Sequence, residues 1–212
     1  MKENQVLEIK NLTLSTENTL ILKDFSLELF KGEILGLYSP TGSGKTSLLN
    51  YIAGIIDKKM IKNGSMNLAE GTVISYAFQD FRLLRNCTVF KNIQLVLSGS
   101  IKKIRSPVPE ERIFEFLKLA GLFEKKDVKA GLLSGGEQQR LSLIRSLIFP
   151  ADLFLLDEPF NALSQTVKIQ NIEATKKLLD INSSTAIIVS HDKTDLEFLC
   201  SKIISLNHIG NL

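Results

Sequence analysis

Residues Ile34–Thr46 read ILGLYSPTGSGKT, and this stretch decides the fold of the chain. Its first part, Ile34–Tyr38, is a short apolar run that predicts a buried strand. The run breaks at a glycine-rich loop, Ser39–Thr46, after which apolar residues return at helical spacing from Leu48 onward. Strand, glycine-rich loop, Lys-Thr and helix is the context in which a nucleotide phosphate loop is found. A flexible Gly/Ser connector is the alternative, but connectors rarely sit tightly between a strand and a helix.

The loop carries the residue types that phosphate binding needs. Gly42 and Gly44 allow the backbone to curl so that consecutive N–H groups point into one concavity. Lys45 can then reach the outer phosphates of a nucleotide, and the Thr46 hydroxyl can ligate Mg²⁺. Ser39 replaces the usual first glycine of the pattern, which a negative φ at that position would allow. The stretch therefore predicts a phosphate loop with one mild departure from the usual pattern.

A second apolar run ends in two acidic residues. Leu153–Leu156 are four consecutive apolar residues, which is typical of a strand buried on both faces in a parallel sheet. Asp157 and Glu158 follow at its carboxyl end, where ligands bind in open α/β sheets. Asp157 suits Mg²⁺ held through water, and Glu158 suits a base that orients an attacking water. Such a pair is common by itself, but combined with a phosphate loop it predicts the metal and catalytic half of one site.

The third motif, Leu133–Arg140, reads LSGGEQQR and precedes an apolar helical pattern that begins at Leu141. Its serine and two glycines place free backbone N–H groups at a helix N-terminus, where an anion binds readily. The same residues also fit a helix cap, with Ser134 as the cap and Glu137 as its capping-box partner. The motif alone supports both interpretations equally, and the two preceding motifs favour anion binding.

Together these motifs resemble the nucleotide-binding subunit of an ATP-binding cassette (ABC) transporter, and the resemblance covers nearly the whole chain. Leu133–Arg140 matches the family signature, Ser39–Ser47 its phosphate loop and Leu153–Glu158 its acidic strand. Gln79 and His191, each at the end of an apolar run, match the Q-loop glutamine and the switch histidine of the family. Five motifs in the family's order within one chain make a specific signal.

The resemblance implies an α/β fold, namely a P-loop NTPase with a parallel-sheet core, a small antiparallel β layer and an inserted helical subdomain. It implies a single ABC ATPase domain over residues 1–212. Residues 1–79 and 133–212 would form the core of that domain, and residues 80–132 the helical subdomain.

The apolar patterns of the chain agree with this outline. Runs at Val6–Lys10, Leu20–Leu22 and Phe25–Phe30 predict the strands of the antiparallel layer. A helix is expected after Pro109, with its stop at Gly121, and it is the clearest one of the inserted part.

The mechanism of the family implies that two cassettes, in a homodimer or a heterodimer, pair head to tail and enclose ATP between them. Each ATP would lie on Ser39–Ser47 of one subunit and beneath Ser134–Gly136 of the other, so that hydrolysis releases the pair. A membrane permease would dock near Gln79 and contact Asp80–Ile93. The residues that this resemblance implies are, for catalysis, Lys45, Gln79, Glu158 and His191; for ATP binding, Ser39, Pro40, Thr41, Gly42, Ser43, Gly44, Lys45, Thr46 and Ser47; for the contact from the second subunit, Ser134, Gly135, Gly136 and Glu137; and for Mg²⁺, Thr46, Gln79 and Asp157.

Two positions depart from the family pattern. Thr16 stands where family members usually stack an aromatic residue on the adenine. Base stacking is worth roughly 1–3 kcal/mol, so its loss is expected to weaken ATP binding. Ser164 ends the sequence Asn161–Ser164, where the family normally has an Asp that helps to couple the two sites, so tight coupling is in doubt.

Composition excludes several other classes of protein. The net charge is only +3 and no basic stripe is present, which argues against a nucleic-acid partner. Cys87 and Cys200 are too few for a disulfide framework or a metal site. No apolar run approaches the length of a membrane span, and the first residues do not open a signal peptide. The sequence therefore predicts a cytoplasmic protein, peripheral on the cytoplasmic face of the cell membrane through a partner.

The transporter type is less clearly marked. Phe160 and Ala162-Leu163 resemble cassettes of small-solute importers, whereas Phe78–Leu84 resembles cell-division and lipoprotein-release cassettes. Import is favoured, because the chain lacks the longer connections of the second group. A nucleotide-switched assembly or regulatory module is the alternative, and the same residues would serve it.

Overall fold

The computed structural model describes residues 2–39, 44–55, 60–99, 108–161, 163–181 and 184–206. The strands are β1 (Gln5–Ser15), β2 (Leu20–Phe30), β3 (Ile34–Tyr38), β4 (Ile61–Leu68), β5 (Ile74–Ala77), β6 (Leu153–Asp157), β7 (Thr185–Ser190) and β8 (Lys202–Ser205). The helices are α1 (Lys45–Ile52), α2 (Val89–Gly99), α3 (Glu110–Leu119), α4 (Gly135–Leu147), α5 (Gln165–Ile181) and α6 (Lys193–Leu199), with short 3₁₀ turns η1 (Phe123–Lys125) and η2 (Ala130–Leu132).

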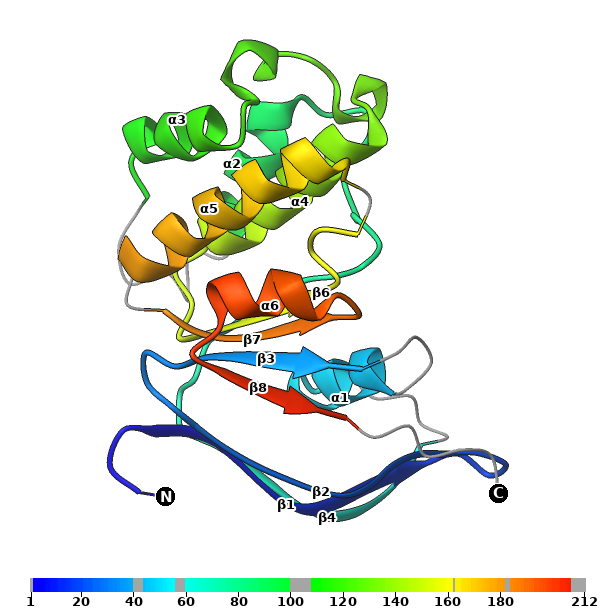
Figure 1. The fold of residues 1–212 in the computed structure, drawn as a ribbon. Helices are drawn as coiled ribbons and strands as arrows, with labels where there is room; N and C mark the ends of the chain where they lie inside the picture. Colours follow the sequence, from blue (N-terminus) through cyan, green and yellow to red (C-terminus); the bar gives the residue numbers. More distant parts are fainter. Residues whose placement is uncertain are drawn as a thin grey trace.

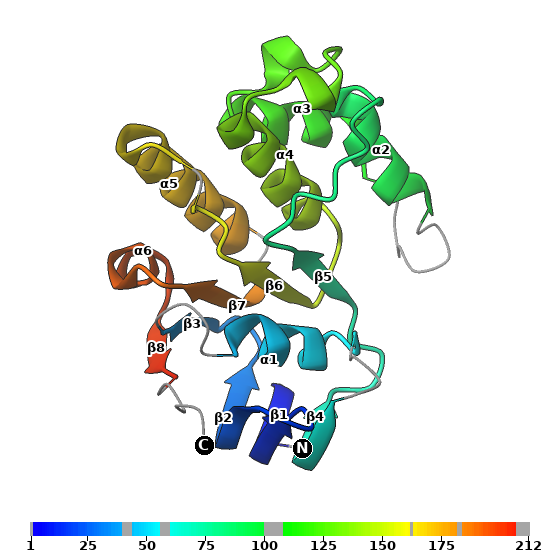
Figure 2. The same ribbon diagram turned by 90° about the vertical axis from the view of Figure 1, so that its right-hand side faces the viewer.

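The strands form two sheets that lie in separate layers (Figure 1). An antiparallel sheet has the order β2-β1-β4, and a parallel sheet has the order β5-β6-β7-β3-β8. Helix α1 lies between the two sheets (Figure 2), where it shares a buried cluster with both of them. Helices α4, α5 and α6 bury apolar residues against the other face of the parallel sheet. The predicted α/β fold, with a parallel core and a small antiparallel layer, is confirmed.

Two interior strands of the parallel sheet, β6 and β7, are buried along their whole length. In β6, Leu153 and Leu155 point into the cluster that contains α1. Phe154 and Leu156 point into the cluster that contains α4. Successive side chains of a strand alternate between its faces, so a strand covered by helices on both faces is apolar at every position. This is why the run before Asp157 contains no polar residue.

The antiparallel layer is larger than the sequence predicted. β1 and β2 each run through 11 residues, whereas the predicted strands were shorter and β2 was split in two. Asn11 and Asp24 adopt φ values of +47° and +49° where the pairing of β1 with β2 shifts its register, so both strands continue past these irregularities. Asn and Asp tolerate a positive φ better than most residues. β4 was not predicted at all, because it is mostly exposed and lacks apolar alternation.

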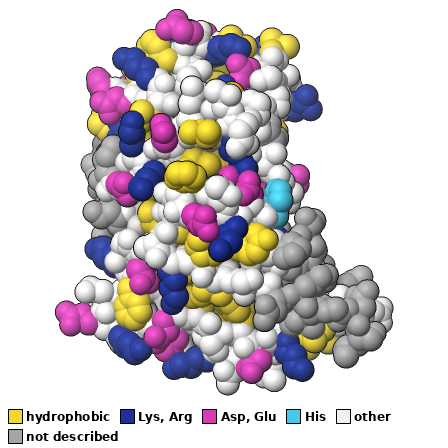
Figure 3. Space-filling model, in the orientation of Figure 1, with side chains coloured by type: hydrophobic (Ala, Val, Ile, Leu, Met, Phe, Trp, Pro, Cys, Tyr) yellow, Lys and Arg dark blue, Asp and Glu magenta, His cyan; other side chains and the backbone are white. Residues whose placement is uncertain are grey.

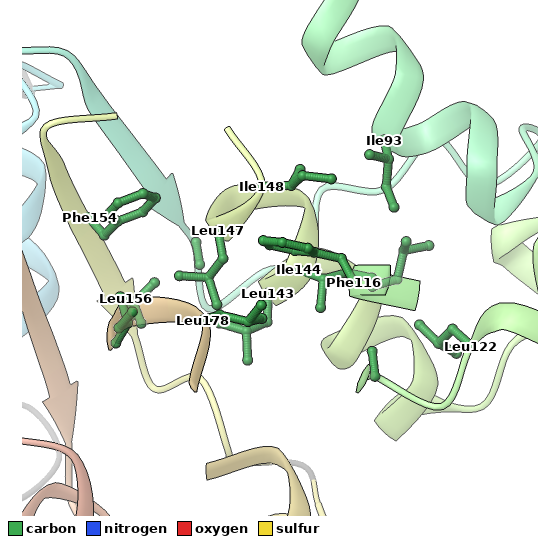
Figure 4. Packing of buried hydrophobic residues seen from close by; sticks show 14 of the residues in the cluster. Ile93, Phe116, Leu122, Leu143, Ile144, Leu147, Ile148, Phe154, Leu156 and Leu178 are labelled. Carbon is green, nitrogen blue, oxygen red and sulfur yellow. The ribbon is translucent and has the colours of Figure 1, made fainter. Parts of the chain in front are cut away.

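The inserted part is helical and packs through α4 onto the sheet. The helix predicted after Pro109 is confirmed as α3, and Gly121 follows it with a φ of +64°. In Figure 4, Ile144 and Leu147 of α4 lie between Phe154 of β6 and Phe116 of α3. One buried cluster thus extends from the parallel sheet into the helical part. The division of the chain at residues 80 and 132 stays a prediction.

The surface is mixed in charge. On the face drawn in Figure 3, basic and acidic side chains are interspersed. Among the described residues, no helix combines the length and the apolar character that a membrane crossing requires.

Candidate functional site

Parallel strands place four of the predicted residues at one edge of the sheet. Ser39 follows β3, Gln79 follows β5, Glu158 follows β6 and His191 follows β7. The arrowheads of the parallel strands point to the same side of the molecule (Figure 1). Residues far apart in the sequence therefore meet at the carboxyl edge of the sheet, where ligands of open α/β folds bind.

The first turn of α1 places backbone N–H groups at this edge. Gly44 precedes the helix, and no described side chain caps its N–H groups. An uncapped helix N-terminus carries partial positive charge and favours an anion. Thr46 and Ser47 lie in this first turn, the former exposed and the latter half-buried. The predicted ligands Pro40, Thr41, Gly42 and Ser43 lie outside the described residues.

Ser39 fits the position that a glycine usually occupies. It is fully buried, and its hydroxyl donates to the carbonyl oxygen of Leu206 at 2.7 Å. Its φ is not positive, as the sequence required. The serine thereby ties the start of the loop to the end of β8.

Gly44 cannot be replaced without displacing its neighbours. Its φ is +82°, and an added Cβ would lie 2.6 Å from Cγ2 and 2.8 Å from the carbonyl oxygen of Ile21. The same contact places the start of β2 against the start of α1. We expect Gly44→Ala to lower nucleotide affinity and to reduce the free energy of unfolding by at least about 1 kcal/mol, since the left-handed conformation alone costs roughly that much.

Gly54→Ala is the matched control for this prediction. Gly54 has a φ of +72°, but an added Cβ would meet nothing within 4 Å. Both variants should melt at lower temperature, and only Gly44→Ala should bind nucleotide more weakly in a titration. Equal nucleotide affinities in the two variants would contradict the role of the Gly44 turn.

Lys45 is buried among oxygen atoms at the same edge. Its Nζ donates to the carbonyl oxygen of Ser39 and lies 3.7 Å from Oε1 of Glu158. Burial lowers the pKa of Lys45, and the carboxylates of Glu158 and Asp157 oppose that shift. A nucleotide phosphate arriving here would meet a positive charge that is already desolvated and held in place.

Glu158 is held by a backbone conformation that is costly for its residue type. Its φ is +50°, and such strain persists at about 1–3 kcal/mol only where the surroundings fix it. Its N–H donates to the carbonyl oxygen of Val189 at 3.0 Å, and its own carbonyl accepts from Nε2 of Gln139 at 3.2 Å. The side chain reaches His191, with 2.8 Å between Oε2 and Nδ1. The acid and the predicted switch histidine are therefore paired.

Asp157 has a carboxylate oxygen with no hydrogen-bond partner among the described residues. The side chain is 2% exposed, and Oδ1 accepts no hydrogen bond from the described residues. Burial raises the pKa of Asp157, and hydrogen bonding to the Thr46 hydroxyl opposes the shift. A buried oxygen without a partner, beside a threonine hydroxyl, fits a hard cation such as Mg²⁺. The described residues hold no group of three or more His, Cys, Asp or Glu that could bind a metal, but Mg²⁺ needs only one or two carboxylates beside substrate phosphates.

Tyr76 was missed by the sequence analysis. Its hydroxyl donates to Oδ1 of Asn50 at 3.1 Å, and its ring stacks on Phe78 with 3.9 Å between the ring centroids. The guanidinium of Arg82 lies 3.5 Å from the Phe78 centroid on this stack. Burial raises the pKa of Tyr76, and the nearby Asp157 adds to that shift. The strand register explains its position: Tyr76 pairs with Leu155 and so lies on the same face of the sheet as Asp157. The sequence alone does not give this register.

Gln79 is exposed, and it lines one small hollow together with Asp157 and Glu158. The loop after it is anchored to α4. Ser142 donates to the carbonyl oxygen of Phe81 at 3.0 Å, and Arg145 donates to the same oxygen and to that of Arg82 at 2.9 Å each. The helix of the signature motif therefore holds the loop that follows Gln79.

The signature motif begins α4 with a complete capping box. The hydroxyl of Ser134 accepts from the N–H of Glu137, and Oε2 of Glu137 accepts from the N–H of Ser134 at 3.0 Å. The bond from Lys125 lowers the pKa of Glu137 most. α4 packs on the face of the sheet opposite α1, so the motif is not brought into contact with Lys45. The helix-cap interpretation is confirmed within the chain.

A model of the ABC transporter family matches residues 22–161. The chain belongs to the ABC transporter family. Membership of this family implies that the site at the sheet edge binds a nucleotide. The match also confirms the predicted P-loop NTPase fold.

The chain is similar to several import proteins. It is 32% identical, over 97% of its length, to the spermidine/putrescine import ATP-binding protein PotA of Fusobacterium nucleatum, and it covers 56% of that protein. It is also 32% identical, over 95% of its length, to the sulfate/thiosulfate import ATP-binding protein CysA of Nitrosomonas europaea, and it covers 58% of that protein. This ABC chain therefore spans a little over half the length of these relatives.

A solved structure agrees over nearly the whole chain. The ATP-binding cassette MJ0796, described as a dimer in a post-hydrolysis state bound to ADP and phosphate, superposes with a TM-score of 0.78 at 28% identity. The match covers 95% of this chain and 94% of that cassette. The two folds thus agree over almost all of both chains.

Proposed function

We propose that this chain is the ATP-binding and ATP-hydrolysing subunit of a membrane importer for a small solute. The observation that carries this proposal is the meeting of Lys45, Glu158 and His191 at the end of the phosphate loop. Import is favoured because relatives similar over almost the whole chain are named as import ATP-binding proteins. The place of action would be the cytoplasmic face of the cell membrane.

The groups at the sheet edge divide the chemistry among them. Lys45 binds the outer phosphates, and the N–H groups at the start of α1 bind the oxygens beside them. Glu158 accepts a hydrogen bond from the attacking water and orients it toward the γ-phosphate. His191 holds the Glu158 carboxylate through its contact with Oε2. Gln79 borders the same hollow and lies where it can sense whether the γ-phosphate is present.

Thr46 and Asp157 would hold Mg²⁺, with Gln79 as a further ligand. Bound there, the ion supplies positive charge against the phosphates. Oδ1 of Asp157, which has no hydrogen-bond partner within the described part of the chain, supports this assignment.

We propose that each site is completed by a second cassette. Ser134 and Gly135 are exposed, and an added Cβ at Gly135 would meet no described atom within 4 Å. Its φ is not positive, so the chain itself gives no reason for glycine there. Close approach of a nucleotide held by another copy explains it. Ser134, Gly135 and Gly136 would then donate to the γ-phosphate, while Glu137 keeps the helix start in shape.

A permease partner would dock on the helical part. Leu84 and Leu132 are 50% and 77% exposed. They lie on neighbouring turns, because the N–H of Gly131 donates to the carbonyl oxygen of Arg85 at 2.9 Å. The side chain of Asn92 fixes the first of these turns by accepting from the N–H of Leu84 at 2.8 Å. This exposed apolar pair lies beside the loop that follows Gln79 and offers a contact for a membrane subunit.

Phosphate release measured against protein concentration tests the proposed function. Because the site is shared, specific activity with ATP and Mg²⁺ should climb as the concentration of the chain rises. Lys45→Ala should bind nucleotide weakly and show no such activity. Activity per chain that stays constant on extreme dilution, where the protein is monomeric, would contradict the shared site, and no hydrolysis at any concentration would contradict the function.

Thr16→Tyr should tighten nucleotide binding. Thr16 is exposed at the turn between β1 and β2, and the contact of Ile21 with Gly44 brings this hairpin close to the phosphate loop. An added aromatic ring would stack on the base, a gain of roughly 1–3 kcal/mol or about tenfold to a hundredfold in affinity. Maximal turnover should change little, since the added binding is uniform. Titration with ATP and GTP checks this, and unchanged affinities would mean that another residue holds the base.

A further inference from the structure

A partly buried cluster of three charges lies beside the site and has no part in the chemistry above. Nζ of Lys168, in the first turn of α5, lies 2.7 Å from Oδ2 of Asp192 and 2.8 Å from Oδ1 of Asp195. The Lys168 side chain is 15% exposed and that of Asp195 only 7%. Burial disfavours the charge of Lys168, but its bonds to the two aspartates raise its pKa overall. The lysine is thus held as a cation between two carboxylates.

The cluster joins the two loops that carry Glu158 and His191. Lys168 lies at the start of α5, the helix that follows Glu158 in the chain. Its N–H donates to the carbonyl oxygen of Ser164 at 2.8 Å. Asp192 is the residue directly after His191. Because β6 and β7 are neighbours in the sheet, these two loops emerge side by side. The lysine bridges them through its contact with Asp192.

Asp192 has little freedom once Lys168 is bound to it. Its N–H donates to the hydroxyl of Ser190 at 3.0 Å, and its Oδ1 accepts from the N–H of Thr194 at 3.0 Å as the cap of α6. Lys168 takes the remaining oxygen. The ring of His191 is by contrast 44% exposed, and its contact at this edge is with Glu158. The N–H of His191 also donates to Oε2 of Glu158, but at 3.4 Å, so the shorter bonds of Asp192 are the firmer anchor of this turn.

We infer that Lys168 is a positioning residue that fixes His191 against Glu158 by clamping Asp192 and Asp195. The inference rests on the proposed ATPase function for its kinetic consequence and on geometry alone for its structural one. Lys168 is placed to link the segment before α5, where Ser164 would lie at the interface with the second cassette, to the switch histidine. A change at that interface would then move His191 through one ion-paired side chain.

Two substitutions of Lys168 separate positioning from folding. Lys168→Arg keeps a cation with several donors and should preserve both contacts. Lys168→Met alone would leave Asp195 buried without a counter-charge, which can unfold a protein. The double variant Lys168→Met/Asp195→Asn removes that charge as well, and it still loses the tie to Asp192. Lys193→Met is the matched control, because Lys193 forms an exposed pair with Glu197 on the same α6.

The kinetic readout is the split between kcat and KM. In the double variant kcat should fall by about tenfold to a hundredfold, as misplacement of a catalytic group by an ångström can cause. KM for ATP should stay within about twofold, because the phosphate contacts are untouched. Lys168→Arg and Lys193→Met should keep both constants near those of the wild type, at unchanged melting temperature. A folded double variant with a normal kcat would overturn the inference.

Nitrogen NMR of the histidine rings gives a readout that needs no hydrolysis. The chain has two histidines, so His208→Gln assigns the signals. The Nδ1 signal of His191, which reports its bond to Glu158, should shift in the double variant and stay in place in Lys168→Arg and Lys193→Met. If the wild type does not hydrolyse ATP, the proposed function fails and this comparison still decides the inference. An unmoved His191 signal in the double variant would overturn it.

Discussion

Replacing Glu158 by Gln is expected to lower ATP turnover by about a hundredfold to ten-thousandfold, the usual contribution of a general base. ATP binding should survive, because Lys45 and the N-terminus of α1 supply the phosphate contacts. The variant should therefore accumulate as an ATP-bound dimer. The amide can still accept a hydrogen bond from Nδ1 of His191, so the strained turn at Glu158 should keep its shape.

Phosphate release and size-exclusion chromatography with ATP measure both effects. Glu173→Gln is a suitable control, since Glu173 is an exposed carboxylate on α5. Near-normal turnover in Glu158→Gln would mean that another group activates the water. Loss of ATP binding together with turnover would mean that the substitution has collapsed the sheet edge rather than removed a base.

Ser134→Arg is expected to abolish turnover while each chain still binds ATP. The side chain of Ser134 is exposed at the start of α4, so an arginine there would project toward the second copy and fill the space for its γ-phosphate. Removing the phosphate donors at this helix start should cost at least about a hundredfold in rate. Loss of the cap adds about 1 kcal/mol of destabilisation.

Ser134→Ala separates the two effects of that change. It loses the capping hydroxyl, which is one of the proposed phosphate donors, but it leaves the space open and keeps the N–H groups of Gly135 and Gly136. Its melting temperature should therefore fall as in Ser134→Arg, and its turnover should drop but stay measurable. ATP affinity of the monomer, measured at high dilution, should match the wild type in both variants. Turnover in Ser134→Arg comparable with that of Ser134→Ala would contradict a phosphate site at this helix start.

Much of the site could be predicted because its parts follow from local patterns. An apolar run bounded by Gly, Asp, Gln or His predicts a strand end, and parallel strands bring their ends to one edge. That reasoning placed Lys45, Asp157 and Glu158 together before any distance was known. The substitution of Ser39 for glycine was also foreseen as tolerable, and its hydroxyl has found a carbonyl partner.

The remainder depends on contacts between distant segments. β4 is polar and exposed, so it has no pattern apart from its pairing with β1. The bridge from Lys168 to Asp192 spans two loops, and nothing in the sequence near either residue reports the other. The positive φ of Glu158 is likewise unusual for glutamate and arises from bonds to Val189 and Gln139. Propensity rules cannot predict a conformation that only the surroundings impose.

Mixing two inactive variants tests most directly whether ATP is hydrolysed between two copies. Lys45→Ala has no working phosphate loop, and Ser134→Arg has no working signature. Each variant alone should be inactive. In a mixed dimer, the phosphate loop of the Ser134→Arg chain meets the intact Ser134 of the Lys45→Ala chain, so one complete site forms. Half of the dimers in an equal mixture are mixed, and each mixed dimer has one working site out of two. About a quarter of the wild-type activity should therefore return. A mixture that stays as inactive as its components, although dimers form, would contradict the shared site.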